Sequence, residues 1–271
     1  MKPFSMPINL TDDARINAVG IGPLGVEMVH DLSRNLPAIT CHEVIINPKG
    51  ESSEQMTALL SLVREGDLLF ILTGFDDEYC EAIARVVGQS AREAGVLTLA
   101  VIPDEACCFV ELAESVDTVF SVSDYSMDDE HISFLALKGA LTGYSMCHMV
   151  TAISNLINQR SFIGVDFADI VTIMRKGGVG RLGVGVASGP TKGRNAAMLA
   201  MERLTSQGVA TLDATGVLVI AQGSSLFTTE VFNDVSRVIY DHVAEGAKMI
   251  VGFVTDAQLG ENIRVSVMAV Q

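Results

Sequence analysis

The sequence contains no tryptophan, and aromatic residues of all kinds make up only 6% of its 271 residues. Since 49% of the residues are nonetheless hydrophobic, the core must be aliphatic, and it can be large. Basic residues are also scarce: 18 Lys and Arg stand against 33 Asp and Glu, which gives a formal net charge of −15. Such a charge repels nucleic acid and anionic lipid, so we expect neither as a partner.

Cysteine shows no pattern of a disulfide framework. The five cysteines are an odd number, none belongs to a C-x-x-C pair, and no signal peptide precedes them. We therefore expect free thiols in the reducing cytoplasm. Cys107 with Cys108, and Cys147 with His148, could suggest redox or metal chemistry. Packing of small side chains is the simpler interpretation, because no further ligand stands at a suitable spacing.

Apolar strands alternate with amphipathic helices along the first half of the chain. We predict strands over residues 15–21, 43–47, 67–72, 95–102 and 117–122, with helices that include 56–64 and 77–94. Strands that are apolar on both faces are typical of a parallel sheet covered by helices on both sides. Later segments predict two helices on a small mixed sheet: strands at 182–188, 216–222, 248–254 and 263–270, and helices at 194–207 and 228–245.

A long apolar helix is predicted between these two parts, over residues 131–159. Gly139 and Gly143 form a small-xxx-small pair, so a membrane span has to be considered. Polar residues such as Lys138 and His148 interrupt the run, and a buried helix between two domains fits better. We predict an N-terminal arm (1–13), a Rossmann-like α/β domain (14–130), the central helix (131–160), a joining loop and helix (161–181) and a smaller α+β domain (182–271).

The joining segment carries the most informative motif. Residues 164–190 read GVDFADIVTIMRKGGVGRLGVGVASGP. A helix that begins near Phe167 places Asp166 and Asp169 at its start, where both carboxylates complement the positive helix end and stay exposed. The glycines that follow are typical of a loop and a closely approached strand. From the residues alone, a helix cap and a solvated acid would explain the two aspartates.

DFAD, the apolar helix and GVGVASG resemble the segment that joins the two domains of FtsZ, the bacterial cell-division GTPase of the tubulin superfamily. The resemblance runs without a gap from Val165 to Gly189 and, through the order of elements, covers most of the chain. It implies the tubulin/FtsZ architecture and a cytoplasmic, polymerising protein of cell division or membrane remodelling. In the family, the aspartates of this loop reach the nucleotide of the next subunit and help activate water. The resemblance therefore implies that Asp166 and Asp169 are catalytic in trans.

The resemblance also implies a GTP site at the C-terminal ends of the strands, where backbone N–H groups and helix N-termini hold phosphate. The family's GGGTGTG signature corresponds here to residues 76–82, which read DDEYCEA and contain no glycine. Side chains then fill space that phosphate needs, and the carboxylates oppose its charge. We therefore predict a degenerate site that binds GTP weakly or not at all.

Some candidate nucleotide contacts remain in the sequence. They are Gly20, Gly22, Gly25, Gly74 and Asn47, the last of which stands where the family has its NTD motif. Asp76 and Asp77 could also join phosphate through Mg²⁺, which would reverse the sign of the electrostatic argument. GTP and Mg²⁺ are thus the cofactors to consider, although the altered loop favours the absence of any cofactor.

Three functions are compatible with these patterns. The first is an FtsZ/tubulin-like cytoskeletal or assembly protein with weak or no GTP hydrolysis, which self-associates head to tail or modulates a true FtsZ. The second is an active GTPase whose site has been rebuilt around a metal ion. The third is an NAD(P)-dependent enzyme, because Gly20-x-Gly22-x-x-Gly25 fits the dinucleotide fingerprint; Asn47, however, replaces the acid that would bind the ribose.

Overall fold

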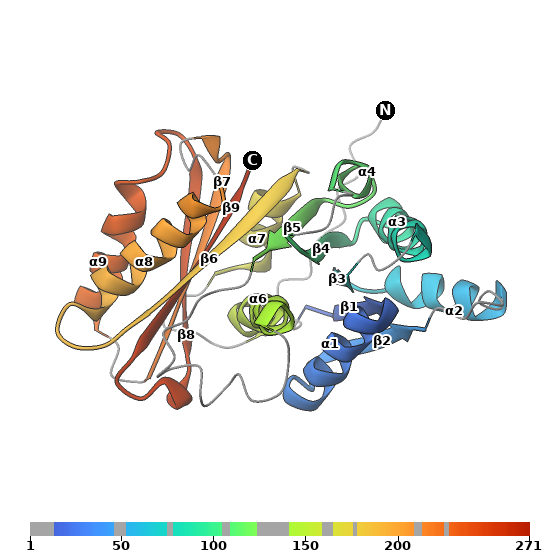
Figure 1. The fold of residues 1–271 in the computed structure, drawn as a ribbon, viewed down its shortest axis with the longest axis horizontal. Helices are drawn as coiled ribbons and strands as arrows, with labels where there is room; N and C mark the ends of the chain where they lie inside the picture. The colour runs from blue at the N-terminus through green and yellow to red at the C-terminus, as the bar shows by residue number, and fades with distance from the viewer. Residues whose placement is uncertain are drawn as a thin grey trace.

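The computed structural model describes residues 14–45, 53–74, 78–104, 109–123, 141–158, 165–175, 178–208, 213–224 and 228–271. Within these residues, nine strands form one continuous sheet in the order β2-β1-β3-β4-β5-β6-β9-β7-β8. Figure 1 shows α6 end-on in the middle of the molecule, with α1 on one side and the C-terminal strands on the other. The predicted N-terminal arm lies outside the described residues.

The N-terminal half is a parallel sheet built from alternating strands and helices. β1 pairs in parallel with β2 and β3, and the parallel ladder continues through β4 to β5. β1, β3 and β5 are buried at every residue, as expected when helices cover both faces. The elements are β1 (Ile16–Ile21), α1 (Gly22–Asn35), β2 (Ile39–Val44), α2 (Ser53–Val63), β3 (Leu68–Thr73), α3 (Glu78–Glu93), β4 (Leu97–Pro103), α4 (Phe109–Ala113) and β5 (Thr118–Val122).

The C-terminal half is a mixed sheet. β9 pairs antiparallel with both β6 and β7, and β7 pairs in parallel with β8. The elements are α6 (Leu141–Asn158), α7 (Phe167–Met174), β6 (Val179–Ala187), α8 (Lys192–Ser206), β7 (Gly216–Gly223), α9 (Thr229–Tyr240), β8 (Lys248–Thr255), the 3₁₀-helix η2 (Ala257–Leu259) and β9 (Ile263–Val270). The predicted fold class, a Rossmann-like half, a central helix and a smaller C-terminal half, is confirmed.

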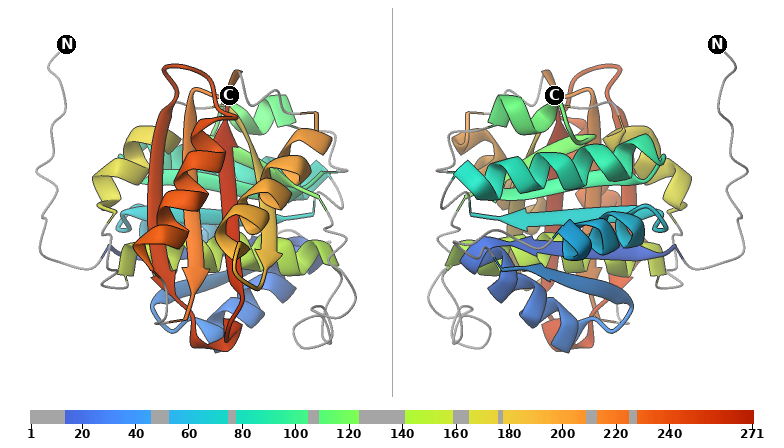
Figure 2. Two further views of the ribbon diagram at one scale, coloured as in Figure 1. Left: turned by 90° about the vertical axis from the view of Figure 1, so that its left-hand side faces the viewer. Right: turned by 90° about the vertical axis from the view of Figure 1, so that its right-hand side faces the viewer.

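Three apolar cores hold these layers together. One lies between the N-terminal strands and α2, α3 and α4, and another lies between β6–β9 and the pair α8 and α9. Figure 2 shows these two helix layers on opposite sides of the molecule. The third core includes Met146, Met149 and Ile153 of α6 together with residues from both halves of the sheet. The central helix therefore packs against both halves at once.

Several boundaries differ from the predictions. The second strand is β2, Ile39–Val44, where 43–47 was predicted, because this edge strand is only partly buried and its apolar pattern is weak. α9 ends at Tyr240, whereas the prediction extended it to residue 245. Just after this end, His242 Nδ1 forms a hydrogen bond of 2.7 Å with the Val238 carbonyl, one of the carbonyls that a helix end leaves without a backbone partner. Residues 131–140 and 159–160 of the predicted central helix lie outside the described residues. No helix among the described residues has the length and hydropathy needed to cross a membrane.

The glycine-rich segment after α7 allows two close approaches. A Cβ on Gly180 would lie 2.4 Å from the ring of Phe120, in the pairing of β5 with β6 that joins the two halves of the sheet. A Cβ on Gly185 would lie 2.0 Å from the carbonyl oxygen of Ala196 in α8. The predicted closely approached strand is therefore β6, whereas its hydrogen bonding to β5 was not predicted.

Candidate functional site

The two aspartates of the DFAD motif lie at the start of α7. Asp166 is the N-cap, and its Oδ1 accepts a hydrogen bond from the backbone N–H of Ala168 at 3.3 Å. Asp169 Oδ2 accepts a hydrogen bond from the backbone N–H of Asp166, also at 3.3 Å. The two carboxylates form a capping box, which satisfies N–H groups that a helix start leaves without partners.

Core and edge contacts fix the position of α7. Ile170 and Met174 are buried. The Met174 carbonyl accepts a hydrogen bond from Thr118 Oγ1 at 2.5 Å, and Arg175 Nη2 donates to the Gly95 carbonyl at 2.7 Å. Because Thr118 begins β5 and Gly95 precedes β4, α7 lies at the N-terminal edge of the parallel strands.

Asp166 and Asp169 are both exposed. Each carboxylate has two oxygens, and together they can accept more hydrogen bonds than the capping box uses. The pair is thus able to orient a water molecule or a cation that another molecule brings to this surface. The structure brings the two residues together as the sequence predicted, and their catalytic role in trans stays a prediction.

The capping box makes the stability cost of changing Asp166 predictable. We expect Asp166→Ala to lower the free energy of unfolding by about 1 kcal/mol, because alanine cannot cap a helix. Asp166→Asn should change it by only a few tenths, since asparagine caps about as well as aspartate. Urea denaturation of the two variants checks this, and equal losses in both would mean that the cap is not what stabilises α7.

Gly20 of β1 and Gly25 of α1 lie where backbone segments approach closely, and a nucleotide contact by either stays a prediction. A Cβ on Gly25 would lie 2.1 Å from the carbonyl oxygen of Leu72 in β3, and a Cβ on Gly20 would lie 2.1 Å from the carbonyl oxygen of Gly25. These two glycines let α1 approach β1 and β3. Gly22 begins α1 with a φ of 73°, which favours glycine. Local packing and backbone conformation are thus sufficient reasons for glycine at these three positions.

Acidic side chains occupy the start of α3, at the C-terminal edge of the sheet. Glu78 is exposed, and Glu81 Oε1 lies 3.9 Å from Arg85 Nη1 in a loose ion pair. Gly74 is half-buried just after β3. The remaining candidates, Asn47, Asp76 and Asp77, lie outside the described residues. Among the residues that are described, no group of three or more His, Cys, Asp or Glu could hold a metal ion.

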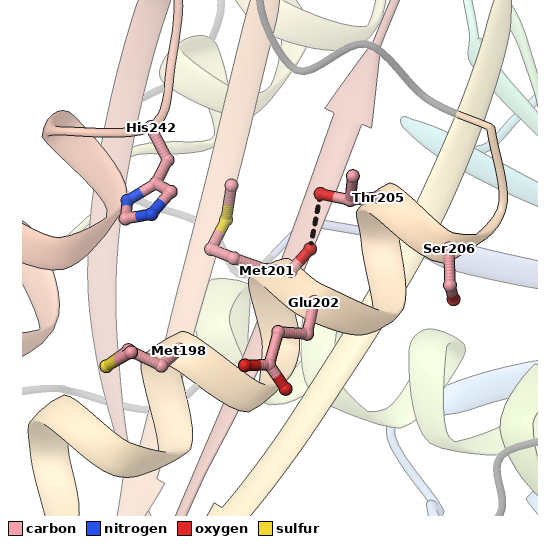
Figure 3. Close-up of a pocket in the computed structure, with 6 residues that line it drawn as sticks. All are labelled: Met198, Met201, Glu202, Thr205, Ser206 and His242. Carbon is pink, nitrogen blue, oxygen red and sulfur yellow. Dashed lines mark hydrogen bonds between the residues drawn. The ribbon is translucent and has the colours of Figure 1, made fainter.

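An open hollow of about 410 Å³ lies on the other side of the C-terminal sheet from α6. Figure 3 shows its lining residues, which come from α8 and from the turn after α9: Met198, Met201, Glu202, Thr205, Ser206 and His242. The Thr205 hydroxyl donates to the Met201 carbonyl at 2.8 Å within the helix. The described lining residues include no glycine and no helix N-terminus, which are the features that commonly hold phosphate.

A buried polar cluster between α6 and β9 was not found from the sequence. His148 Nε2 and Ser266 Oγ are 2.8 Å apart, and the His148 ring stacks on Tyr144 with 6.2 Å between centroids. Burial, and then the positive charge of Arg264, lowers the pKa of His148 to about 3. The available signal was the alternation of Arg264 and Ser266 along the last strand, which puts both on one face.

Comparison with known proteins agrees with this architecture. The FtsZ family C-terminal domain matches residues 178–271. The cell division protein FtsZ of Pseudomonas aeruginosa is 32% identical over 227 residues, which cover 78% of this chain and 57% of that protein. FtsZ of Pseudomonas putida is 29% identical over 242 residues, covering 80% of this chain and 58% of that protein. The chain thus spans less than three-fifths of the length of these relatives.

Solved structures show the same fold at lower sequence identity. An empty FtsZ dimer of M. jannaschii matches with a TM-score of 0.81 and 18% identity, covering 96% of this chain and 89% of that one. CetZ2 from Haloferax volcanii, a GTPγS-bound protofilament, matches with a TM-score of 0.66 and 16% identity, covering 94% and 92%. The FtsZ-type C-terminal domain and the similarity to FtsZ proteins together show that the chain belongs to the tubulin/FtsZ superfamily.

Proposed function

We propose that the chain is an FtsZ/tubulin-like assembly protein with a degenerate GTP site, which self-associates head to tail or modulates a true FtsZ. The proposal rests on an asymmetry between the two edges of the parallel sheet. Asp166 and Asp169 are exposed beside the N-terminal edge, where a neighbour's nucleotide site could meet them. The C-terminal edge, where a nucleotide of its own would bind, carries Glu78 and Glu81 in the first turn of α3.

Charge makes the start of α3 a poor place for phosphate. The repulsion between a carboxylate and one phosphate charge about 5 Å away is roughly 3 kcal/mol at an effective dielectric constant of 20. A helix N-terminus offers an anion only about 0.3 to 1 kcal/mol at a typical surface site. Since the repulsion is the larger quantity, we expect GTP hydrolysis by the chain alone to be weak or absent.

A head-to-tail arrangement follows from the position of the two edges. A contact between one edge of a subunit and the opposite edge of the next is heterologous, and such contacts generate open filaments. As proposed, the chain has the aspartates but no working nucleotide site. It could therefore complete the GTP site of one neighbour, whereas the neighbour at its other end would have no GTP site to complete. This would stop or slow growth at one end of a mixed filament.

The proposal is tested by titration and by mixing. Fluorescent GTP, with and without Mg²⁺, is expected to show no saturable binding to the chain. Mixed with FtsZ of Pseudomonas aeruginosa and GTP, the chain should co-sediment and change the rate of GTP hydrolysis. In Asp166→Asn/Asp169→Asn the effect on hydrolysis should vanish, whereas the fold is kept because asparagine still caps the helix. Tight GTP binding, or an unchanged effect in the double variant, would contradict the proposal.

An active GTPase with a metal-assisted site is the second candidate. It is favoured by the start of α1, where no side chain caps the helix at Ile21 and Gly22 opens the turn. The first N–H groups of such a helix are able to meet phosphate. Turnover by the chain alone that requires Mg²⁺ and rises above a threshold protein concentration would select this candidate over the first.

A further inference from the structure

Arg264 is a buried cation without a counter-ion in the part of the chain that the structure describes. Only 7% of its surface is exposed. It lies on the same face of β9 as Ser266, which contacts α6, and Met268, which belongs to the core around α6. None of the ion pairs among the described residues includes Arg264. Buried charges are normally paired, because removing them from water is costly.

Among the described residues, the polar groups of this region of β7, β9 and α6 other than Arg264 are uncharged. Gln222 of β7 is the cross-strand partner of Arg264, is 2% exposed, and has a side-chain oxygen without a hydrogen-bond partner. The hydroxyl of Ser145, which is 1% exposed, likewise has none. Ser145 stands one helical turn before His148, whose ring is hydrogen-bonded to Ser266 and is held neutral. The cluster thus has one positive charge and several unused hydrogen-bonding atoms.

We propose that this cluster binds a small oxyanion, a carboxylate or a phosphate, between α6 and the C-terminal sheet. The planar guanidinium of Arg264 matches two oxygens of such a group and supplies the charge. The Ser145 hydroxyl can donate to the anion, and a half-turn of the Gln222 carboxamide presents its N–H₂ group instead of its oxygen. These residues differ from the aspartates of α7 and from the glycine turn of α1, so the site is separate from the proposed nucleotide and assembly surfaces.

An anion held here would connect parts of the chain that are far apart in sequence. Ser145 and His148 belong to α6, whereas Gln222 and Arg264 belong to β7 and β9. The bound anion would offset the charge of Arg264 and add contacts between the central helix and the C-terminal sheet. A ligand that binds only the folded protein stabilises it, and once the anion concentration exceeds the dissociation constant the stabilisation grows with the logarithm of their ratio.

The test compares inorganic phosphate, acetate and citrate with chloride at equal ionic strength, using the full chain. At about 100 times the dissociation constant, the effective anion should raise Tm by roughly 5 °C. A shift with phosphate alone identifies a phosphate site, and a shift with acetate or citrate identifies a carboxylate site. No shift with any of the three overturns the proposal.

Two variants separate specific binding from general salt effects on stability. Arg264→Gln should abolish the shift, and Arg237→Gln, at an exposed arginine of α9, should keep it. In chloride, Arg264→Gln should fold with a Tm close to that of the parent, because it removes an uncompensated charge. Should it fail to fold, Arg264→Lys keeps the charge without the planar fork and should weaken binding at least several-fold in equilibrium dialysis with labelled phosphate or acetate. Equal shifts in the parent and Arg264 variants mean an adventitious ion only and overturn the proposal.

Discussion

Replacing Gly25 by alanine is expected to lower the free energy of unfolding by about 3 kcal/mol relative to a matched glycine-to-alanine change, as overpacking in a core does. The new Cβ would lie 2.1 Å from the backbone oxygen of Leu72 and 3.1 Å from the backbone of Gly20. Neither backbone atom can move without shifting α1 or a central strand of the sheet. Urea or thermal denaturation of the nucleotide-free protein measures the loss.

Gly143→Ala is the matched control, because it makes the same chemical change at another buried helical glycine. Its Cβ would meet only the end of the Met28 side chain, with the nearest atom at 2.7 Å. That flexible end can move, and alanine gains up to about 1 kcal/mol of helix propensity at either position. Equal stability of the two variants would mean that close packing does not require glycine at position 25. The hypothesis that Gly25 contacts the phosphate of a nucleotide would then be favoured.

The start of α7 was predictable because its causes are local. Asp166 and Asp169 cap the backbone within the same helical turn, so the spacing of DFAD is enough to place both carboxylates. The same holds for β3, whose apolar run leaves few alternatives to a buried strand, and for β9, where Arg264 and Ser266 alternate with apolar residues as a strand requires. β9 has the predicted bounds, Ile263–Val270.

The features that the sequence did not predict depend on partners that are distant along the chain. The pairing of Val119 with Val179 joins the two halves of the sheet, and next to it Phe120 lies against Gly180. β2 was misplaced because, at the sheet edge, its Thr40 and Glu43 face solvent and break the apolar pattern. No local pattern links residues so far apart.

The polar cluster around His148 was hidden for a related reason. In the sequence, His148 appears only as an interruption of an apolar helix, and Arg264 as one charge in an apolar strand. Only the tertiary structure, in which His148 of α6 contacts Ser266 of β9, shows that His148 and Arg264 are both buried in one region. The candidate site at Asp166 and Asp169 could be located from sequence, whereas the inferred anion site required the tertiary structure.

His148 should give the folded protein a pronounced sensitivity to acid. Its pKa is about 3 in the folded state, against about 6.5 for an unperturbed histidine in the unfolded chain. Between these values the unfolded state binds more protons, so the stability from neutral His148 is complete above the unfolded pKa and is lost as the pH falls. The free energy of unfolding should decrease by up to about 1.4 kcal/mol per pH unit, or roughly 3 kcal/mol between pH 7 and pH 4.

Urea denaturation at several pH values measures this slope, and His148→Gln isolates it. The glutamine amide can form a hydrogen bond with the Ser266 hydroxyl and does not titrate. The free energy of unfolding of the variant should therefore fall less steeply with decreasing pH, and the remaining slope should come from the carboxylates. The charge that faces His148 is that of Arg264 on β9, so protonation would place two cations in one buried cluster. Parent-like acid sensitivity in His148→Gln would show that the histidine is not neutral and buried in solution.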